Sequence, residues 1–549
     1  MPTAAPAERY AAHLNRTPSP KTDPDAGLRG LGHYERRLPA WRFRLRQRLI
    51  PIVRWETPYL ARMQELCRTP LLDSYFAISA NLGTHTFFMT ALPICFWCGY
   101  PEMGIALVQM LALGVYLSGY VKDLVCLPRP LSPPLHRITM SGSAALEYGF
   151  PSTHTTNAVS VAIYCIYRLS LLQRDPSDLT YRALTIGCYV YAASITFGRM
   201  YCGMHGFFDV IFGGILGALI AWVRIAYGPA FDQWVIEGNW TNAAIVVLVL
   251  GIAVRIHPEP ADNCPCFDDS VAFSGVVMGV AIGTWHYYCL RFPQSLANIY
   301  TFENHNLLYP VARVVLGILA IFVWRATMKP LLLQTLPPIF RSVDTWGFRL
   351  PRRYFLQSRD YKSVPTLRKD DNVIPPASEI PAMVSNLRHP RRRAISVGPQ
   401  SEADAREFIA NREQRRRNSR SASAKPALDD ASVKALSTGD SAAQITQYPE
   451  VANTTSYLDA GEGRRRQAQS HLQVGGTDIN LLTPPLSDAG ASSDSGREDE
   501  KNDREMFSSL QKPRIRYDVE VITKLVVYAG IAWLAVEGNP LLFSRMGLT

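Results

Sequence analysis

Charged side chains are scarce in this sequence. Asp, Glu, Lys and Arg make up 19% of the 549 residues, whereas a soluble globular protein contains roughly 25%. The mean hydropathy is nevertheless close to neutral, at −0.02. A uniformly apolar membrane protein would give a clearly positive value, so long uncharged runs must alternate with a strongly polar part. This distribution excludes a chain built only of soluble domains.

Signals of secreted or lipid-anchored proteins are lacking as well. The ten cysteines are scattered, and several lie inside apolar runs, which argues against a disulfide framework. Residues 1–30 contain no apolar core, so we expect no cleavable signal peptide. Residues 546–549 form neither a prenylation box nor an ER-retrieval signal. The net charge of +11 favours an acidic membrane surface over nucleic acid, because most of the clustered Arg lies outside the apolar runs.

The apolar runs predict an all-α polytopic membrane protein. A crossing needs about 20 mostly apolar residues, and we expect eight or nine transmembrane helices. The candidate runs lie near residues 83–99, 103–121, 155–172, 182–198, 207–227, 242–255, 271–289, 307–327 and 520–537. A further run at 331–340 contains Pro337 and Pro338, is too short to span, and is expected to lie in the interface.

Composition divides the chain into four parts. The first is a basic tail that is either solvated or lies on anionic lipid. The third is rich in Arg, Ser, Asp, Ala and Pro and cannot bury enough apolar surface to become ordered. The predicted parts are the N-terminal tail 1–70, the membrane domain 71–342, the disordered segment 343–515, and a C-terminal transmembrane helix with its tail, 516–549.

The third part carries a pattern that suits basophilic kinases. Basic triplets precede Ser396 and Ser419, so a kinase is a candidate partner. The alternatives are an unregulated linker, or a segment that itself carries the function while the membrane part anchors it.

Three polar clusters lie at the ends of predicted helices, where ionisable groups are expensive and therefore often functional. The first follows the 103–121 run and contains Lys122 and Arg129, with Pro128 and Pro130 ending the helix. Both cations suit an anion site. The alternative is that they snorkel from a helix end toward the membrane interface.

The second cluster precedes the 155–172 run. Ser152 or Thr153 can cap this helix, and the free N–H groups of a helix start form an anion site. His154 adds a titratable group there. The alternative is an ordinary cap with an incidental histidine.

The third cluster precedes the 207–227 run and contains Arg199, His205 and Asp209. His205 and Asp209 are four residues apart, so on a helix they share a face and can form a hydrogen bond. A carboxylate on one ring nitrogen orients an imidazole and makes its other nitrogen a better nucleophile. The alternative is a purely structural His–Asp pair.

The order of the helices brings the three clusters together. The 155–172 and 182–198 runs form a hairpin, which returns the chain to the membrane face where it began. All three clusters therefore lie on one face. Cations, a helix start, two histidines and a carboxylate suit a phosphoryl group, because they can hold its oxygens, attack phosphorus and protonate the leaving oxygen.

The motifs, in this order, resemble the three-part signature of the type 2 phosphatidic acid phosphatase (PAP2) superfamily over roughly residues 70–290. They are Lys122-x6-Arg129-Pro130, Pro151-Ser152-Thr153-His154 and Arg199-x5-His205-x3-Asp209. The sequence departs from the usual pattern at Thr153 and Gly198, where the family often has Gly and Ser. Neither departure removes a catalytic group.

The resemblance implies a helical-bundle core and metal-independent hydrolysis without a cofactor. His205 resembles the nucleophile that forms a phosphohistidine, and Asp209 resembles its orienting carboxylate. His154 resembles the general acid, which then becomes the base that activates water. The residues that resemble the oxyanion cradle are Lys122, Arg129, Ser152 and Arg199. We expect no metal, because Cys264 and Cys266 with the nearby His257 offer too few ligands for zinc.

Residues 257–269, together with 201–206, resemble the sphingosine-1-phosphate phosphatase branch and its fungal long-chain base phosphate members. This resemblance implies an endoplasmic reticulum membrane enzyme that hydrolyses sphingoid base 1-phosphates. One of four carboxylates could pair with the substrate ammonium: Glu259, Asp262, Asp268 or Asp269. The alternative is an ordinary loop whose acidic residues cap a helix. The alternatives are a phosphatidate or isoprenyl-phosphate phosphatase, and a non-catalytic membrane protein that binds or carries phospholipid.

Overall fold

The computed structural model describes residues 26–29, 31–79, 85–131, 135–138, 146–172, 178–289, 308–347, 352–364 and 515–548. These residues are mostly helical, as the sequence predicts. The helices are α2 (Leu31–Arg37), α3 (Ala40–Cys67), α4 (Pro70–Ser79), α5 (His85–Trp97), α6 (Pro101–Val125), α7 (Thr153–Ser170), α8 (Leu179–Tyr201), α9 (Phe207–Glu237), α10 (Trp240–Ile256), α11 (Cys266–Cys289), α12 (Leu308–Thr345), α17 (Val519–Trp533) and α18 (Asn539–Arg545). A π-helical turn, Leu534–Gly538, joins the last two helices. Strands β1 (Phe355–Leu356) and β2 (Arg516–Tyr517) form a short parallel pair.

Five helices of the described chain are long and apolar enough to cross a membrane. They are α6, α9, α11, the part Tyr309–Thr345 of α12, and the C-terminal stretch Val519–Arg545. Helix α10 is apolar but shorter. Helices α7 and α8 do not meet the same measure, because polar and tyrosine side chains dilute their apolar character. The chain is therefore a multi-pass membrane protein.

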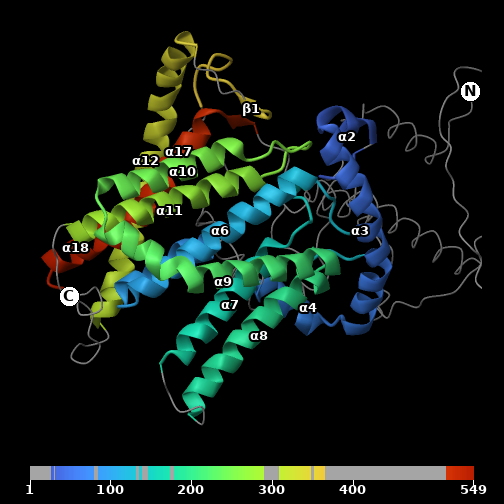
Figure 1. Ribbon diagram of the computed structural model, residues 1–549, viewed down its shortest axis with the longest axis horizontal. Helices are drawn as coiled ribbons and strands as arrows, with labels where there is room; N and C mark the ends of the chain where they lie inside the picture. The colour runs from blue at the N-terminus through green and yellow to red at the C-terminus, as the bar shows by residue number, and fades with distance from the viewer. Residues whose placement is uncertain are drawn as a thin grey trace, which may run out of the picture. The chain divides into compact units, whose positions relative to one another are not determined.

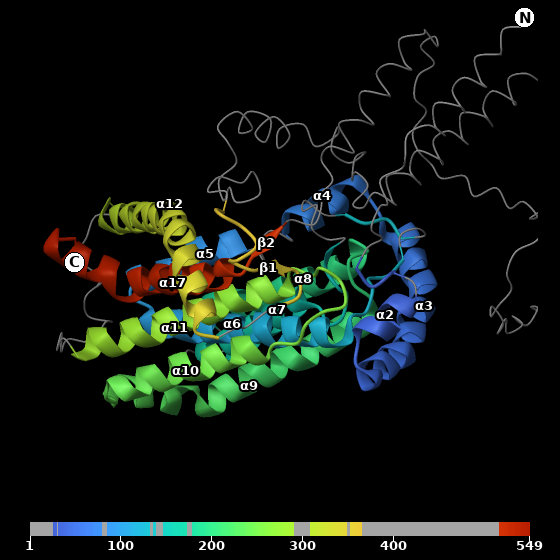
Figure 2. The ribbon, with the colours of Figure 1, turned by 90° about the horizontal axis from the view of Figure 1, so that it is seen from above.

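Helix α6 lies at the centre of the packing that supports the polar clusters. It contacts α7, α9 and α11, and these helices run alongside one another (Figures 1 and 2). Helix α6 begins with Pro101 in its first turn, where the missing N–H costs nothing. It ends at Cys126, whose left-handed backbone (φ 56°) turns the chain away. Lys122 therefore belongs to the last turn of α6, rather than following the helix as the sequence suggested.

The N-terminal part differs from the expected basic tail. Residues 31–67 form α2 and α3, and α3 crosses the end of the bundle and contacts α6, α8 and α9 (Figures 1 and 2). Its residues Arg42 and Arg46 are buried rather than solvated or lipid-bound. Arg42 Nε donates to Leu124 O at 2.7 Å and Arg46 Nε donates to Cys126 O at 3.1 Å. These two cations satisfy carbonyl groups that the end of α6 leaves open.

The C-terminal helix packs directly on the core. Along α11, Gly275 and Gly279 face the backbone of α17, and an added Cβ would lie 2.8 Å from Leu525 O or 2.0 Å from Ala529 O. Small residues four apart let helix backbones approach closely. The stretch from residue 516 therefore completes the bundle, although 150 residues outside the described chain precede it.

The second half of α12 and the residues that follow it include two of the segments named in the sequence analysis. The run at 331–340 continues α12 as helix through Pro330, Pro337 and Pro338, and its position in the membrane interface stays a prediction. Beyond it, residues 352–364 pack near the start of α17, where Ser358 N donates to Asp518 Oδ2 at 2.7 Å. Ser396 and Ser419 lie outside the described residues, as does most of the predicted disordered segment.

Candidate active site

The short connection between α8 and α9 holds a buried histidine–carboxylate pair. Nδ1 of His205 lies 3.5 Å from Oδ2 of Asp209, and neither side chain is exposed by more than 1%. Asp209 is in the first turn of α9, where its Oδ2 accepts a hydrogen bond from Gly206 N at 3.0 Å. The carboxylate thus faces one ring nitrogen, as the sequence suggested, although His205 lies just before α9 and does not share a helical turn with Asp209.

The other ring nitrogen of His205 faces a cation. Nη1 of Arg129 lies 3.2 Å from Nε2 of His205. A guanidinium has no acceptor, so Nε2 must accept this hydrogen bond with its lone pair. The ring proton is then on Nδ1, toward Asp209. Burial, followed by the charges of Arg129, Arg199 and Lys122, holds the pKa of His205 well below its usual value, so the ring is neutral.

Arg129 is held by further contacts from the same loop region. Its Nη1 also donates to Met204 O at 2.8 Å, and its Nε donates to Glu147 O at 3.2 Å. Its Nη2 donates to the carboxylate Oε2 of Glu147 at 2.6 Å. Nζ of Lys122 lies 3.6 Å from the same oxygen. The first cluster thus meets the third, and both meet a glutamate that the sequence analysis did not single out.

A backbone hydrogen bond connects the start of α7 to Asp209. Ser152 N donates to Asp209 O at 3.0 Å, which ties the start of α7 to the start of α9. The Ser152 hydroxyl caps α7 by accepting from Thr155 N at 3.4 Å. His154, half-buried in the first turn, is near enough to His205 to contribute to the lowering of its pKa. The second cluster therefore lies beside the other two.

The two departures from the superfamily pattern have local explanations. Oγ1 of Thr153 lies 2.8 Å from Oγ of Ser118 on α6, so this side chain links two helices. At Gly198, an added Cβ would lie 2.7 Å from the ring of Phe76, so α4 leaves no room for a serine as the helices stand. Arg199, next in α8, is buried, and its Nε has no hydrogen-bond partner among the described residues.

Glu56 of α3 is a second carboxylate that the sequence analysis missed. Its Oε2 accepts from Phe208 N at 2.9 Å, so it caps the start of α9 beside Asp209. Gly206 makes this approach possible, because an added Cβ would lie 1.6 Å from Oε1 of Glu56. Burial, with a smaller contribution from Asp209, raises the pKa of Glu56 to about 7, against the N–H donors that lower it.

The region that contains these residues matches a known family. The model of the PAP2 superfamily matches residues 103–232. Over 304 residues, the chain is 43% identical to the dihydrosphingosine 1-phosphate phosphatase C823.11 of Schizosaccharomyces pombe, covering 55% of this chain and 73% of that relative. The chain belongs to the PAP2 superfamily. It is also 33% identical to the dihydrosphingosine 1-phosphate phosphatase YSR3 of Saccharomyces cerevisiae, covering 57% of this chain and 76% of the relative.

A more distant PAP2 relative is the sphingosine-1-phosphate phosphatase 2 of Homo sapiens. It is 28% identical over 277 residues, covering 49% of this chain and 67% of the relative. No solved structure matches the chain significantly.

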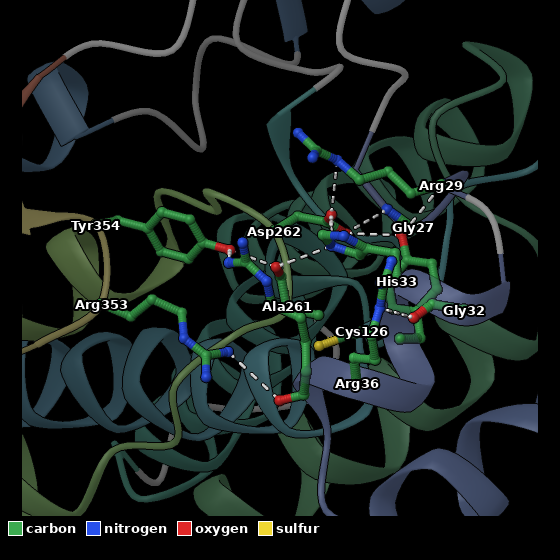
Figure 3. A network of polar contacts seen from close by, with 12 residues as sticks. Gly27, Arg29, Gly32, His33, Arg36, Cys126, Ala261, Asp262, Arg353 and Tyr354 are labelled. Atoms are coloured by element: carbon green, nitrogen blue, oxygen red, sulfur yellow. Dashed lines mark hydrogen bonds and ion pairs between the residues drawn. The ribbon is translucent and has the colours of Figure 1, made fainter.

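The loop between α10 and α11 of this PAP2 chain is fixed by ion pairs. Asp262 is the hub: it accepts from Gly27 N at 3.0 Å and pairs with Arg29 and His33, each at 3.2 Å (Figure 3). Tyr34 and Tyr148 also donate to its Oδ2, at 2.8 and 3.0 Å. These contacts hold the N-terminal segment against the loop.

Asp268 also forms two ion pairs. Its Oδ2 lies 3.0 Å from Nε of Arg516, and its Oδ1 lies 2.7 Å from Nζ of Lys524. Asp262 and Asp268 are thus committed to packing the chain. Asp262 is 4% exposed and pairs with Arg29, and Asp268 is 9% exposed and pairs with Arg516 and Lys524. Neither carboxylate is therefore open to a substrate ammonium without rearrangement, and the pairing stays a prediction.

The two cysteines of this loop lie beside a carboxylate of α6. Sγ of Cys264, Sγ of Cys266 and a carboxylate oxygen of Asp123 lie within 4.8 Å of one another. The two sulfur atoms are only 2.8 Å apart, whereas two thiolates on one tetrahedral zinc ion lie roughly 3.8 Å apart. His257 does not complete the group: its Nε2 faces Ser270 Oγ at 3.2 Å, and its Nδ1 lies 3.8 Å from Asp123 Oδ2. This arrangement does not have the geometry of a zinc site.

Proposed function

We propose that the protein hydrolyses long-chain sphingoid base 1-phosphates, such as dihydrosphingosine and phytosphingosine 1-phosphate, to the free base and phosphate. The observation that carries this proposal is the 43% identity to a dihydrosphingosine 1-phosphate phosphatase, over 73% of that relative. A second relative with the same printed activity supports it at 33% identity. The product lipid would enter sphingolipid metabolism as a free base.

The reaction would begin when a phosphoryl oxygen takes the Nη1–H of Arg129 from Nε2 of His205, which frees the Nε2 lone pair to attack phosphorus. Nε2 carries the lone pair and faces the cation cradle, while Nδ1–H faces Asp209, which stabilises the positive charge that develops on the ring. The P–O bond to the lipid breaks, and His154 protonates the leaving alkoxide. His154 then takes a proton from water, which attacks phosphorus, breaks the P–N bond of the phosphohistidine and returns Nε2 to its starting state.

The cations would stabilise the charge that spreads over the phosphoryl oxygens. Arg129 and Lys122 already hold a carboxylate oxygen between them, at 2.6 and 3.6 Å. Buried Arg199 lies near enough to Arg129 for the two charges to interact. Three cations that are fixed before the substrate arrives need little reorganisation in the transition state, which is the most effective form of electrostatic catalysis. Ser152, at the start of α7, would help these cations to bind the phosphoryl oxygens.

Location and topology belong to the same proposal. We place the enzyme in the endoplasmic reticulum membrane, because the branch it resembles consists of enzymes of that membrane. Adding α5, α7, α8 and α10 to the five long apolar helices gives the upper count of nine crossings. A basophilic kinase acting at Ser396 or Ser419 is the proposed regulator, supported by the basic triplets that precede both residues.

The test is phosphate release by the full-length chain in mixed detergent–lipid micelles. Dihydrosphingosine 1-phosphate, phosphatidate and an isoprenyl phosphate are compared at equal surface concentration, each alone and in competition. Preferential release from dihydrosphingosine 1-phosphate is expected. Preferential release from either other lipid would favour the alternative phosphatases. Binding of lipid phosphate without release would favour a carrier.

A further inference from the structure

Glu147 contacts the two cations that the proposed mechanism assigns to the substrate phosphate. Its Oε2 lies 2.6 Å from Nη2 of Arg129 and 3.6 Å from Nζ of Lys122. The two cations are 3% and 4% exposed, whereas Glu147 is 27% exposed. The carboxylate therefore sits at the outer side of the cation pair. An arriving phosphate oxygen has to displace it.

Displacement leaves a carboxylate beside a newly bound anion. Two like charges at contact distance oppose binding, because their repulsion in a partly dry site is not screened by water. A lipid that offers only a phosphate therefore loses part of its binding free energy to this repulsion. A lipid that also carries a positive charge next to its phosphate regains this binding free energy, because that charge attracts the carboxylate.

Sphingoid base 1-phosphates bring such a charge. Their C2 ammonium is four bonds from phosphorus, so it remains close to any group that contacts the phosphate. We propose that Glu147 is the ammonium-binding residue of the site and makes it selective for amine-bearing lipid phosphates. This inference rests on the proposed function. The phosphate takes Arg129 and Lys122 from Glu147, and the released carboxylate pairs with the ammonium.

The backbone around Glu147 is suited to such an exchange. Arg129 Nε donates to the backbone oxygen of Glu147 at 3.2 Å, independently of the carboxylate. The next residue, Tyr148, is fully buried, and its hydroxyl donates to Asp262 at 3.0 Å. The side chain of Glu147 can therefore rotate between partners while its backbone stays in place.

Four other carboxylates of this region already have contacts of their own. Asp209 is fully buried against His205, and Glu56 caps α9. Asp262, in the loop before α11, and Asp268, in the first turn of α11, are held in ion pairs. Glu147 is the carboxylate of the described chain that combines partial exposure with contact to both Arg129 and Lys122. The side chain of Glu147 would then attract a lipid phosphate that carries an ammonium and repel one that does not.

The experiment compares two substrates that differ only in the ammonium. They are dihydrosphingosine 1-phosphate and its N-acetylated counterpart, assayed with the full-length chain in mixed micelles. We expect the wild type to prefer the amine in kcat/KM. In Glu147→Gln this preference should fall by roughly 10- to 100-fold, the range for loss of a partly desolvated ion pair, with kcat/KM for the N-acetylated lipid unchanged or higher.

Two variants accompany Glu147→Gln. Glu147→Asp retains the charge on a shorter side chain and should keep part of the preference, which also provides a folded variant if Glu147→Gln is unstable. Glu102→Gln removes a carboxylate that is 80% exposed at the start of α6, the opposite end of that helix from Lys122, and should leave the preference unchanged.

An unchanged preference in Glu147→Gln would overturn the inference, as would an equal fall for both substrates, which would mark Glu147 as a support of the cation pair. In both cases the wild type still hydrolyses dihydrosphingosine 1-phosphate, so the proposed function stands. Failure of the wild type to release phosphate from that lipid would instead overturn the proposed function, and this inference with it.

Discussion

Nη1 of Arg129 lies 3.2 Å from Nε2 of His205, the ring nitrogen that does not face Asp209. Arg129, which would bind a phosphoryl oxygen, therefore lies on the side of the His205 ring from which the Nε2 lone pair would attack phosphorus. A phosphate bound to Arg129 would bring phosphorus close to Nε2, as a near-attack arrangement requires.

Asp209→Asn should lower kcat by about a thousandfold with little change in folding. The amide keeps the size of the carboxylate but not its charge, so the imidazolium that forms on attack is no longer stabilised and the Nδ1–H tautomer is less favoured. Steady-state kinetics measure this. Asp232→Asn, farther along α9 and paired with Arg224, is the matched control. A kcat within threefold of wild type in Asp209→Asn would exclude an orienting role.

Arg129→Lys should reduce kcat/KM about a hundredfold. Lysine keeps the charge but cannot reproduce the fork that contacts His205, Met204 and Glu147 at once. Arg62→Lys is the control, because Arg62 is 74% exposed in a pair with Glu65 and exposed pairs contribute little. If Arg129→Lys matched Arg62→Lys in kcat/KM, the guanidinium geometry would not matter.

Glu56→Gln should change how stability depends on pH. The pKa of Glu56 is raised from 4.5 to about 7, so between these values the folded protein holds a proton that the unfolded chain has released. The free energy of unfolding therefore falls as pH rises through this window, by up to about 1.4 kcal/mol per pH unit. Glutamine cannot titrate, yet it still accepts from Phe208 N.

Melting in detergent at pH 5, 6, 7 and 8 measures this effect. The Tm of Glu56→Gln relative to wild type should increase with pH, by about 2–4 °C for each kcal/mol. Parallel Tm curves for the two proteins would contradict the raised pKa.

Gly279→Leu should destabilise the bundle by about 1–3 kcal/mol or more, because the new side chain would enter the space of Ala529 O, 2.0 Å from the ideal Cβ position. Gly251→Leu in α10 is the control, since an added Cβ there meets nothing within 4 Å. Tm in detergent distinguishes them. Equal Tm values would mean that α17 does not depend on close backbone contact with α11.

The sequence was sufficient for the elements that local pattern controls. Apolar runs located most helices to within a few residues. The spacing of His205 and Asp209 correctly predicted that their side chains lie close together, although His205 precedes α9 instead of belonging to its first turn. The hairpin of α7 and α8 implied that the three polar clusters would meet. Their contacts agree with that reasoning, while the catalytic roles of the individual residues remain proposals.

The features that were missed depend on tertiary contacts. Arg42 and Arg46 alternate with apolar residues, a pattern that also suits a lipid surface, and only the open carbonyls at the end of α6 explain their burial. Glu56 reaches α9 across about 150 residues of sequence. Glu147 belongs to no periodic pattern, and its importance is visible only from its contacts with Lys122 and Arg129.

The most direct test of the account is the reaction of phosphate-labelled dihydrosphingosine 1-phosphate with wild type and His205→Ala, in EDTA and with equal Tm values established beforehand. The account predicts that wild type releases phosphate and that rapid quenching traps an acid-labile phosphoenzyme, while His205→Ala shows neither. Phosphate release by His205→Ala at a rate near that of wild type would contradict the claim that Nε2 of His205 attacks phosphorus.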